Sequence, residues 1–164
     1  MVEDVVAALG FLCLGTRFKR IGERLQAETQ RLLDELEVKV PSSRYPFLAA
    51  LDRLGPLTIG ELAQAIGISQ PAVTRSLTQL VDLGLVEAGT SPEDQRRRVV
   101  ALSAAGRRLV ETGKRDVWPR LEAAVADLCA PLSGPLLEQL AAIEEGLANL
   151  SLDRRAARRR EAAR

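Results

Sequence analysis

The chain has 164 residues, of which 46% are hydrophobic, 27% are charged and 3% are aromatic. This length is enough for one domain, or for one compact domain with long helical extensions. The scarcity of aromatic residues argues against recognition of single-stranded nucleic acid, because such recognition uses aromatic side chains that stack on bases. A formal net charge of +1 excludes a protein held on nucleic acid by a uniformly basic surface.

Basic residues are concentrated in two short stretches instead. Residues 96–98 are consecutive arginines, and six further arginines follow residue 153, beside Asp153 and Glu161. A near-neutral chain with a focused basic edge is compatible with binding to specific sites on nucleic acid. For the terminal run, 153–164, a solvated and frayed tail is the favoured interpretation.

Several classes of protein are not supported by the sequence. The first four residues are acidic or apolar and the apolar stretch after them is short, so neither a signal peptide nor a membrane span is predicted, and a cytoplasmic location is expected. Cys13 and Cys129 are too far apart to indicate a disulfide framework or metal-ligand spacing, and the chain contains no histidine. There is no nucleophile with a spaced base and no glycine-rich phosphate loop. The sequence therefore predicts no enzyme activity, no metal site and no cofactor.

From about Val5 to Leu36 the sequence predicts one long helix. Its apolar positions follow a 4-3-4-7 spacing, a seam that requires a partner helix: Leu14, Phe18, Ile21, Leu25 and Leu32. Gly15 and Gly22 lie on one face, and each costs about 1 kcal/mol relative to alanine within a helix, which suggests close approach of another backbone. The partner is left open: the chain's own C-terminal helices, a second chain across a dimer axis, or an ordinary intrachain core.

A break at residues 40–43 separates this helix from the next one, which is expected to run to about Leu54. Pro46 is placed in its first turn, where proline is tolerated. The side chains predicted to face inward are Phe47, Leu48 and Leu51. Gly55 and Pro56 end the helix.

Two short capped helices follow. Thr58 and Glu61 have the spacing of a capping box, and the helix that they start ends at Gly67, where a left-handed residue is needed. Ser69 is a new N-cap with Pro71 in the first turn of the second helix, which stops before Gly84. The inward side chains are Leu62, Ala63 and Ile66 in the first helix, and Val73, Leu77 and Leu80 in the second. Two such helices joined by about three residues form a helix-turn-helix, whose second helix enters the major groove of DNA.

The outward face of the second helix favours a role in DNA recognition. It carries short hydrogen-bonding side chains and one arginine, where a generic solvated helix would carry more Glu and Lys: Gln70, Pro71, Thr74, Arg75, Thr78 and Gln79. These side-chain types suit base edges and phosphates. An ordinary surface helix is the alternative.

Beyond Gly84 the apolar period changes to that of strands. Residues 85–87 form a short predicted strand, residues 98–102 form its antiparallel partner, and the turn-rich segment 88–97 lies between them. Such a hairpin is a wing, which can place guanidinium groups on a groove beside the recognition helix.

The segment from Asp94 to Gly106, DQRRRVVALSAAG, together with ISQPAVT at residues 68–74, resembles the winged-helix core of the MarR family of bacterial transcription regulators. The shared pattern is Asp, any residue, Arg, then Leu-Ser and a glycine three residues later. The resemblance implies a mostly α (α+β) fold: a winged helix-turn-helix with a two-stranded wing, plus long N- and C-terminal helices that form a dimerisation layer. We therefore expect the winged helix at 41–103, the helical dimerisation region at 1–40 and 104–152, and a basic tail at 153–164.

Downstream of the wing, Ser103 caps a helix whose apolar stripe continues through Leu109, Val117, Leu121, Val125 and Leu128. Gly113 and Pro119 interrupt it, so a bend is expected near Trp118. Pro131 stops this helix, and residues 133–135 start the last one. Its apolar residues repeat at a 4-3-4-3 spacing: Leu136, Leu140, Ile143, Leu147 and Leu150.

The function that these features imply is a homodimeric, sequence-specific regulator of transcription, favoured as a repressor, that binds double-stranded DNA at an inverted-repeat operator. The residues assigned to the major groove and nearby phosphates are Ser69, Gln70, Pro71, Thr74, Arg75, Thr78 and Gln79. On the wing, the resemblance implies that Asp94 holds an arginine by ion pairing, that Arg96 reaches the minor groove, and that Arg97 and Arg98 contact phosphates.

Regulation by a small-molecule effector or by oxidation is left open. Many relatives in the resembled family bind small aromatic or anionic compounds between the dimer layer and the winged helix, and here apolar side chains with Arg17 and Arg20 are available. Cys13 lies roughly where a peroxide-sensing branch of the family carries its reactive cysteine, although Tyr45 is the only tyrosine that could polarise a thiolate. A winged helix that contacts proteins instead of DNA is the other alternative.

Overall fold

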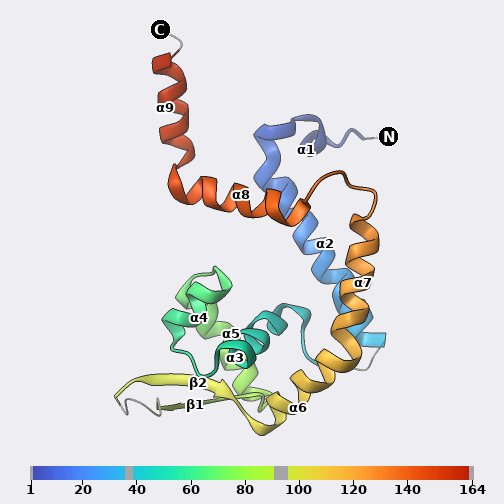
Figure 1. Ribbon diagram of the computed structural model, residues 1–164, viewed down its shortest axis with the longest axis vertical. Coiled ribbons are helices and arrows are strands. Elements are labelled where there is room, and N and C mark those ends of the chain that lie inside the picture. The colour runs from blue at the N-terminus through green and yellow to red at the C-terminus, as the bar shows by residue number, and fades with distance from the viewer. Residues whose placement is uncertain (1, 36–38, 91–95, 163–164) are drawn as a thin grey trace. The chain divides into compact units, whose positions relative to one another are not determined.

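The computed structural model describes residues 2–35, 39–90 and 96–162 and separates into two compact units, Met1–Glu122 and Ala123–Arg164. The first unit contains the helix-turn-helix and a two-stranded hairpin, and the described elements of the second are all helices (Figure 1). The fold is therefore mostly α with a small antiparallel sheet, which confirms the predicted fold class.

The N-terminal segment is not one continuous helix, so this part of the prediction was wrong. It forms a short helix α1 (Val5–Ala8), a 3₁₀ turn η1 (Gly10–Cys13) and the long helix α2 (Leu14–Glu35). The break occurs at Gly10, whose φ of +53° is a left-handed conformation that suits glycine. Asp4 caps α1 and also accepts two hydrogen bonds from the Arg20 guanidinium, at 2.9 and 3.0 Å, which fastens the short helix to α2. Leu36, the predicted end of the helix, lies outside the described residues.

Along α2 the predicted seam is only partly covered within the first unit. Leu33 is buried, whereas the seam residues are half-buried or exposed, the exposed ones being Phe18 and Ile21. A Cβ added at Gly15 or Gly22 would meet no described atom of this unit within 4 Å. The close backbone approach predicted for these two glycines is therefore absent from the described part of the first unit.

The core of the first unit is formed by three helices: α3 (Tyr45–Leu54), α4 (Ile59–Ile66) and α5 (Gln70–Asp82). A 3₁₀ turn, η2 (Ser42–Arg44), precedes α3, and Pro46 lies in the first turn of α3, as predicted. The side chains predicted to face inward are buried, except that Ile66 is only partly buried: Phe47, Leu48, Leu51, Leu62, Ala63, Val73, Leu77 and Leu80. Burial of large apolar side chains stabilises the fold by about 1.5–3 kcal/mol each. Because Val73, Leu77 and Leu80 must stay in the core, they determine which side of α5 faces solvent.

The predicted start and end signals of α4 are present in the structure. Thr58 Oγ1 accepts the Glu61 amide at 3.2 Å, and Glu61 Oε2 accepts the Thr58 amide at 2.9 Å, which completes the capping box. Gly67 ends the helix with a φ of +75°. Ser69 occupies the N-cap position of α5, but its side chain makes no capping hydrogen bond, in contrast to the prediction. Pro71 in the first turn has no amide hydrogen, which removes one of the donors that such a cap uses.

The wing is an antiparallel hairpin of β1 (Val86–Thr90) and β2 (Arg98–Leu102). β1 starts one residue later than the predicted strand 85–87 and is longer, because pairing with β2 continues through Gly89 to Thr90. Leu57 pairs with Val100 on the other edge of β2 through two hydrogen bonds of 2.8 and 3.0 Å. The hairpin is thus tied to the segment that leads into α4, and in Figure 1 it lies along one side of α3, α4 and α5.

After the wing, Ser103 caps α6 (Ala104–Thr112) by accepting the Gly106 amide at 3.0 Å, as predicted. The predicted interruption near Trp118 takes the form of a π-helical turn, η3 (Gly113–Val117), which joins α6 to α7 (Trp118–Cys129). The Trp118 indole lies against Gly113, where an added Cβ would come within 2.8 Å of its Nε1. Lys114 binds Asp52 of α3 at 2.7 Å and holds this turn on α3.

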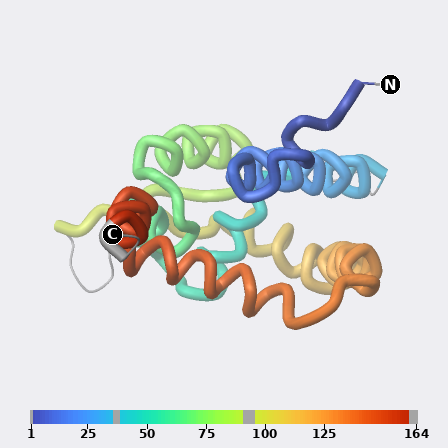
Figure 2. The backbone as a smooth tube through the Cα atoms, turned by 90° about the horizontal axis from the view of Figure 1, so that it is seen from above, coloured from blue at the N-terminus to red at the C-terminus, as the bar shows by residue number. Residues whose placement is uncertain are grey.

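The second unit contains the end of α7, helix α8 (Leu136–Asn149) and helix α9 (Leu152–Ala162). The predicted last helix therefore ends before Leu150, and the basic run is helical as far as Ala162 instead of frayed. Arg155 of α9 donates to the carbonyl oxygens of Gly146 and Leu150, the latter at 2.9 Å, and so joins the two helices. In Figure 2, α9 is seen nearly end-on while α8 lies across the view, so the two helices are not collinear.

Candidate nucleic-acid interface

The predicted recognition face of α5 points outward. The residues assigned to the major groove are all exposed to solvent: Ser69, Gln70, Pro71, Thr74, Arg75, Thr78 and Gln79. The opposite side of the helix is buried in the core, where Val73 and Leu80 are both 0% exposed. The structure therefore presents these side chains together on one outward surface.

The hydroxyl groups of the two threonines on this face already donate hydrogen bonds within α5. Thr74 Oγ1 donates to the Gln70 carbonyl at 3.0 Å, and Thr78 Oγ1 donates to the Thr74 carbonyl at 3.1 Å. Each hydroxyl keeps lone pairs that can accept hydrogen bonds, and each side chain keeps a methyl group. Both groups suit base edges, the methyl group against thymine and the oxygen against a base amino group.

Arg44, the last residue of η2, belongs to this surface although no sequence pattern identified it. Its guanidinium donates two hydrogen bonds to Gln79 Oε1, one from Nε at 2.9 Å and one from Nη2. The two residues are 35 positions apart, so no local spacing predicts the contact. The one hint is that Arg44 directly precedes α3, a helix that packs in the same core as the helix-turn-helix.

The three wing arginines, Arg96, Arg97 and Arg98, all have exposed side chains. Arg97 also forms an ion pair with Glu61 of α4. Asp94, which the family resemblance pairs with an arginine, lies outside the described residues. The ion pair places Arg97 beside the helix-turn-helix.

Glu61 is the point at which the capping box and the wing meet. Its carboxylate accepts hydrogen bonds from the Thr58 amide and hydroxyl, at 2.9 and 2.8 Å, and from the Arg97 guanidinium. These donors, of which the Thr58 amide contributes most, hold the pKa of Glu61 below its usual value. The carboxylate is therefore ionised at neutral pH, and its charge is compensated by groups that bind it directly.

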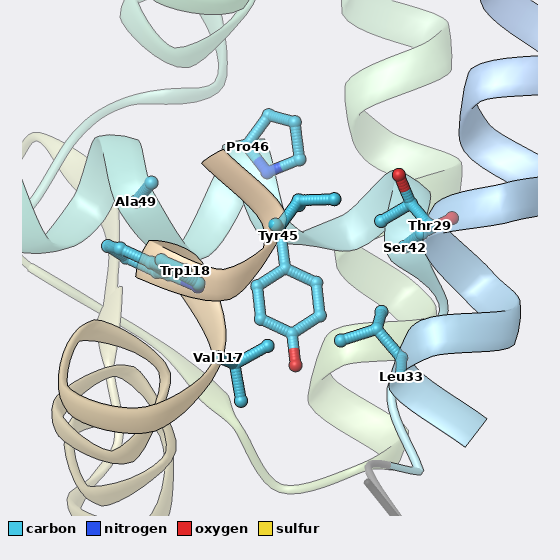
Figure 3. A pocket seen from close by; sticks show the side chains of 9 residues that line it. Thr29, Leu33, Ser42, Tyr45, Pro46, Ala49, Val117 and Trp118 are labelled. Carbon is cyan, nitrogen blue, oxygen red and sulfur yellow. The ribbon is translucent and has the colours of Figure 1, made fainter. Parts of the chain in front are cut away.

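A separate feature of the first unit is a cavity of about 300 Å³ (Figure 3). It is lined by Thr29, Leu33, Ser42, Tyr45, Pro46, Ala49, Val117, Trp118 and Leu121. The Tyr45 ring lies between Leu33 on one side and Val117 and Trp118 on the other. Its hydroxyl is buried with no hydrogen-bond partner among the described residues, and burial raises the pKa of this phenol. Arg17 and Arg20, which the sequence suggested for a pocket, are not among the lining residues.

Both cysteines are free in the described part of the chain. Cys13 ends η1 and is half-buried, as is Cys129 at the end of α7. The oxidation hypothesis needs a tyrosine that polarises Cys13, but the Tyr45 hydroxyl bonds to none of the described residues. Within those residues there is also no group of three or more metal-binding side chains, and no helix has the length and apolarity to cross a lipid bilayer.

Comparison with known proteins identifies the family. A sequence profile described as the MarR family matches residues 38–97. An uncharacterized HTH-type transcriptional regulator of Mycobacterium bovis is 33% identical over 101 residues, which are 58% of this chain and 71% of that protein. The chain belongs to the MarR family.

Solved structures of transcription regulators share the fold. A MarR family transcriptional regulator from Silicibacter pomeroyi matches with a TM-score of 0.60 and 26% sequence identity, over 87% of this chain and 91% of the other. The MepR–DNA complex from S. aureus matches with a TM-score of 0.64 and 19% identity, over 87% and 96% of the two chains, a likeness of fold alone. Family and fold together identify this chain as a winged-helix transcription regulator, which is not a class of enzyme.

Proposed function

We propose that this protein is a homodimeric, sequence-specific repressor that binds double-stranded DNA at an inverted-repeat operator. The observation that carries the proposal is the single outward face of α5, polar apart from Pro71 and joined to a wing with three arginines. The MepR structure, which has the same fold, is a complex with DNA. Each α5 would enter a major groove, and each wing would reach the groove beside it.

The proposed DNA contacts fall into two groups. Major-groove and nearby phosphate contacts come from Ser69, Gln70, Pro71, Thr74, Arg75, Thr78 and Gln79. On the wing, Arg96 reaches the minor groove, because a narrow groove concentrates negative potential, and Asp94 holds an arginine in place. Arg97 and Arg98 contact phosphates. A guanidinium has five N–H donors, so the pair with Glu61 leaves Arg97 with donors for a phosphate.

The proposed dimer is supported by apolar surface that one chain leaves uncovered. Leu140, Ile143 and Leu147 of α8 repeat at the spacing of a helix-packing seam, yet they are 36%, 40% and 50% exposed. Near the N-terminus, Phe11 and Leu12 are 93% and 81% exposed, and apolar surface of this kind marks interaction sites. We place the dimerisation region at 1–40 and 104–152, the DNA-binding domain at 41–103 and a basic segment at 153–164. Two-fold symmetry of the protein then requires an inverted repeat in the operator.

The Tyr45 cavity supports release from DNA by a small-molecule effector. Its volume of about 300 Å³ is at the lower end of ligand sites, which are mostly apolar with a few polar groups. Its walls come from α2 and α7 of the proposed dimerisation region and from α3 of the proposed DNA-binding domain. A small aromatic compound would fill the apolar space beside the Tyr45 ring. Filling this space would change how the two regions pack and hence the placement of α5.

The proposal is tested by titrating the protein onto duplexes taken from the DNA that flanks its own gene, at several salt concentrations. Binding through several phosphates should weaken steeply as the salt concentration rises. An unrelated duplex of equal length should compete poorly. If no duplex shows salt-dependent binding, the proposal is wrong and a winged helix that contacts proteins becomes the better interpretation.

A further inference from the structure

The contact between Arg44 and Gln79 determines which atoms of Gln79 remain for another partner. A glutamine side chain offers a carbonyl oxygen, which accepts hydrogen bonds, and an NH₂ group, which donates two. A guanidinium has donors only, so Arg44 must bind the oxygen, and it does so from Nε at 2.9 Å and from Nη2. The NH₂ group of Gln79 is therefore the end of the amide left for DNA.

We infer that Arg44 is a positioning residue for sequence choice: it presents Gln79 to DNA as a hydrogen-bond donor and withholds its acceptor. This inference rests on the proposed function, because it requires α5 to lie in the major groove. Gln79 is exposed on the same face of α5 as Arg75 and Thr78.

The consequence concerns the bases that Gln79 can recognise. A glutamine whose amide is free binds adenine through both ends, with its oxygen on the N6 amino group and its NH₂ group on N7. That paired contact is lost when the oxygen is held by a guanidinium. The remaining donors match acceptors, which are guanine O6 and N7, adenine N7, thymine O4 or a phosphate oxygen, and of the bases only guanine offers two of them. They do not match cytosine, which presents an amino donor in the major groove.

Arg44 is itself held in place by α2 and by its own turn. The amide of Ser42, the first residue of η2, donates to Gln30 Oε1 at 2.7 Å, and Ser42 Oγ donates to the Gln26 carbonyl at 3.1 Å. Arg44 Nη1 also donates to Ser43 Oγ at 3.3 Å. Rotation of the Gln79 amide would therefore break two charge-assisted hydrogen bonds to a residue whose backbone is anchored.

The inference predicts a change in base preference and not only in affinity. Duplexes are selected from a randomised pool by the wild-type protein, Arg44→Ala and Gln79→Met. In each half-site, the wild type should show a position that prefers guanine or thymine and disfavours cytosine. Arg44→Ala frees the Gln79 oxygen for the adenine N6 amino group and should shift the preference at that position towards adenine. Gln79→Met should accept all four bases there, with affinity for the wild-type site reduced about 5- to 150-fold.

Control variants separate this role from a general loss of charge or structure. Arg24→Ala removes an exposed arginine from α2 and should select the wild-type sequence. In the Gln79→Met background, Arg44→Ala should cause no further change in base preference or affinity, because Arg44 acts through Gln79. Thermal unfolding shows whether each variant is folded, and Arg44→Met, which keeps an apolar side chain without hydrogen-bond donors, replaces Arg44→Ala if the latter is not.

Three other outcomes are informative. If each variant weakens binding equally for every sequence, and the double variant is no weaker than Gln79→Met, Gln79 contacts a phosphate and the role in sequence choice is overturned. The inference would be overturned if a folded Arg44→Ala or Gln79→Met protein kept wild-type affinity and base preference. It would also be overturned if the double variant bound DNA more weakly than Gln79→Met. In both cases the proposed function stands. A wild-type protein that enriches no duplex would overturn both.

Discussion

Arg97 of the wing binds the Glu61 carboxylate that also closes the capping box at the start of α4. One side chain thereby joins the hairpin to the first helix of the helix-turn-helix, 36 positions away in the chain. A winged helix that binds DNA contacts it with the recognition helix and the wing at once, so their spacing determines which phosphates both can reach. Glu61 therefore contributes to the stability of α4 and to the geometry of the proposed DNA surface.

Replacing Glu61 by Gln should lower the free energy of unfolding at neutral pH. Glutamine can still complete a capping box, but it removes the charge that attracts Arg97. Because the pKa of Glu61 is lowered in the folded protein, its ionisation stabilises the folded state. That stabilisation is complete above the usual glutamate pKa of 4.5 and is lost as the pH falls through the lowered value. The difference in stability between wild type and Glu61→Gln should therefore shrink in acid.

Urea unfolding of the two proteins between neutral pH and acid measures this difference. Glu87→Gln removes an exposed carboxylate from β1 and should change stability little at any pH. A difference between wild type and Glu61→Gln that stays constant with pH would show that ionisation of Glu61 is not involved.

Gly106 is required by the packing of α6 on the segment before β1. An alanine Cβ at this position would lie 2.0 Å from the Leu85 carbonyl oxygen, a backbone atom that already accepts the Ser103 amide at 3.0 Å. Gly106→Ala should therefore lower the free energy of unfolding by about 1–3 kcal/mol. Gly89→Ala, at a position with no described atom within 4 Å, should be nearly neutral. Equal stability of the two variants in chemical denaturation would contradict the contact.

Tyr45→Phe should not destabilise the protein in the absence of a ligand. The variant removes a buried hydroxyl that has no partner among the described residues, so the free energy of unfolding should stay constant or rise by up to about 1 kcal/mol. A clear loss of stability without ligand would mean that the hydroxyl is satisfied in solution.

Most of the helix-turn-helix could be predicted because its signals are local. Thr58, Gly67 and Gly84 mark helix ends from a few neighbouring residues, and the structure has a cap or a positive φ at each of them. The spacing of the buried residues determines which side of α5 faces the core. Once that rotation is known, the exposure of Arg75 and Gln79 follows from the helical period.

The features that the sequence did not reveal depend mostly on contacts between distant residues. Gly10 can continue a helix or adopt the positive φ that breaks it, and its residue type permits both. β1 extends to Thr90 because β2 offers partners, which the strand propensity of Gly89 does not indicate. The contact of Arg44 with Gln79 is likewise tertiary. Helix α9 is a different case, since alanine and arginine are strong helix formers and its composition already favoured a helix.

Removing apolar side chains from α8 should dissociate the proposed dimer. Burial of Ile143 and Leu147 in an interface would contribute about 1.5–3 kcal/mol each. The double variant Ile143→Ser, Leu147→Ser should therefore raise the dissociation constant about 100-fold or more. Glu145→Ser, on the other side of the helix, should leave it unchanged. Sedimentation equilibrium measures both, and identical masses for wild type and double variant would remove this seam from the interface.

Arginines of α5 and the wing should affect DNA binding in different ways. Arg75→Ala should cost about 1–3 kcal/mol and relax sequence preference if Arg75 contacts a base. Arg96→Ala should weaken binding to all sequences and reduce the slope of log affinity against log salt by about 1. Fluorescence anisotropy at several salt concentrations separates the two effects, with Arg24→Ala as a control. An Arg96→Ala protein with wild-type affinity at every salt concentration would exclude the wing from the interface.

The central claim is that two copies of the α5 surface engage one duplex at the same time. Hydroxyl-radical protection mapping on the DNA that flanks the gene tests it most directly. We predict two protected stretches related by inverted symmetry, centred about one helical turn apart, with protected minor-groove positions beside them from the wings. Protection of a single stretch, or of two stretches without inverted symmetry, by a folded wild-type protein would contradict the claim.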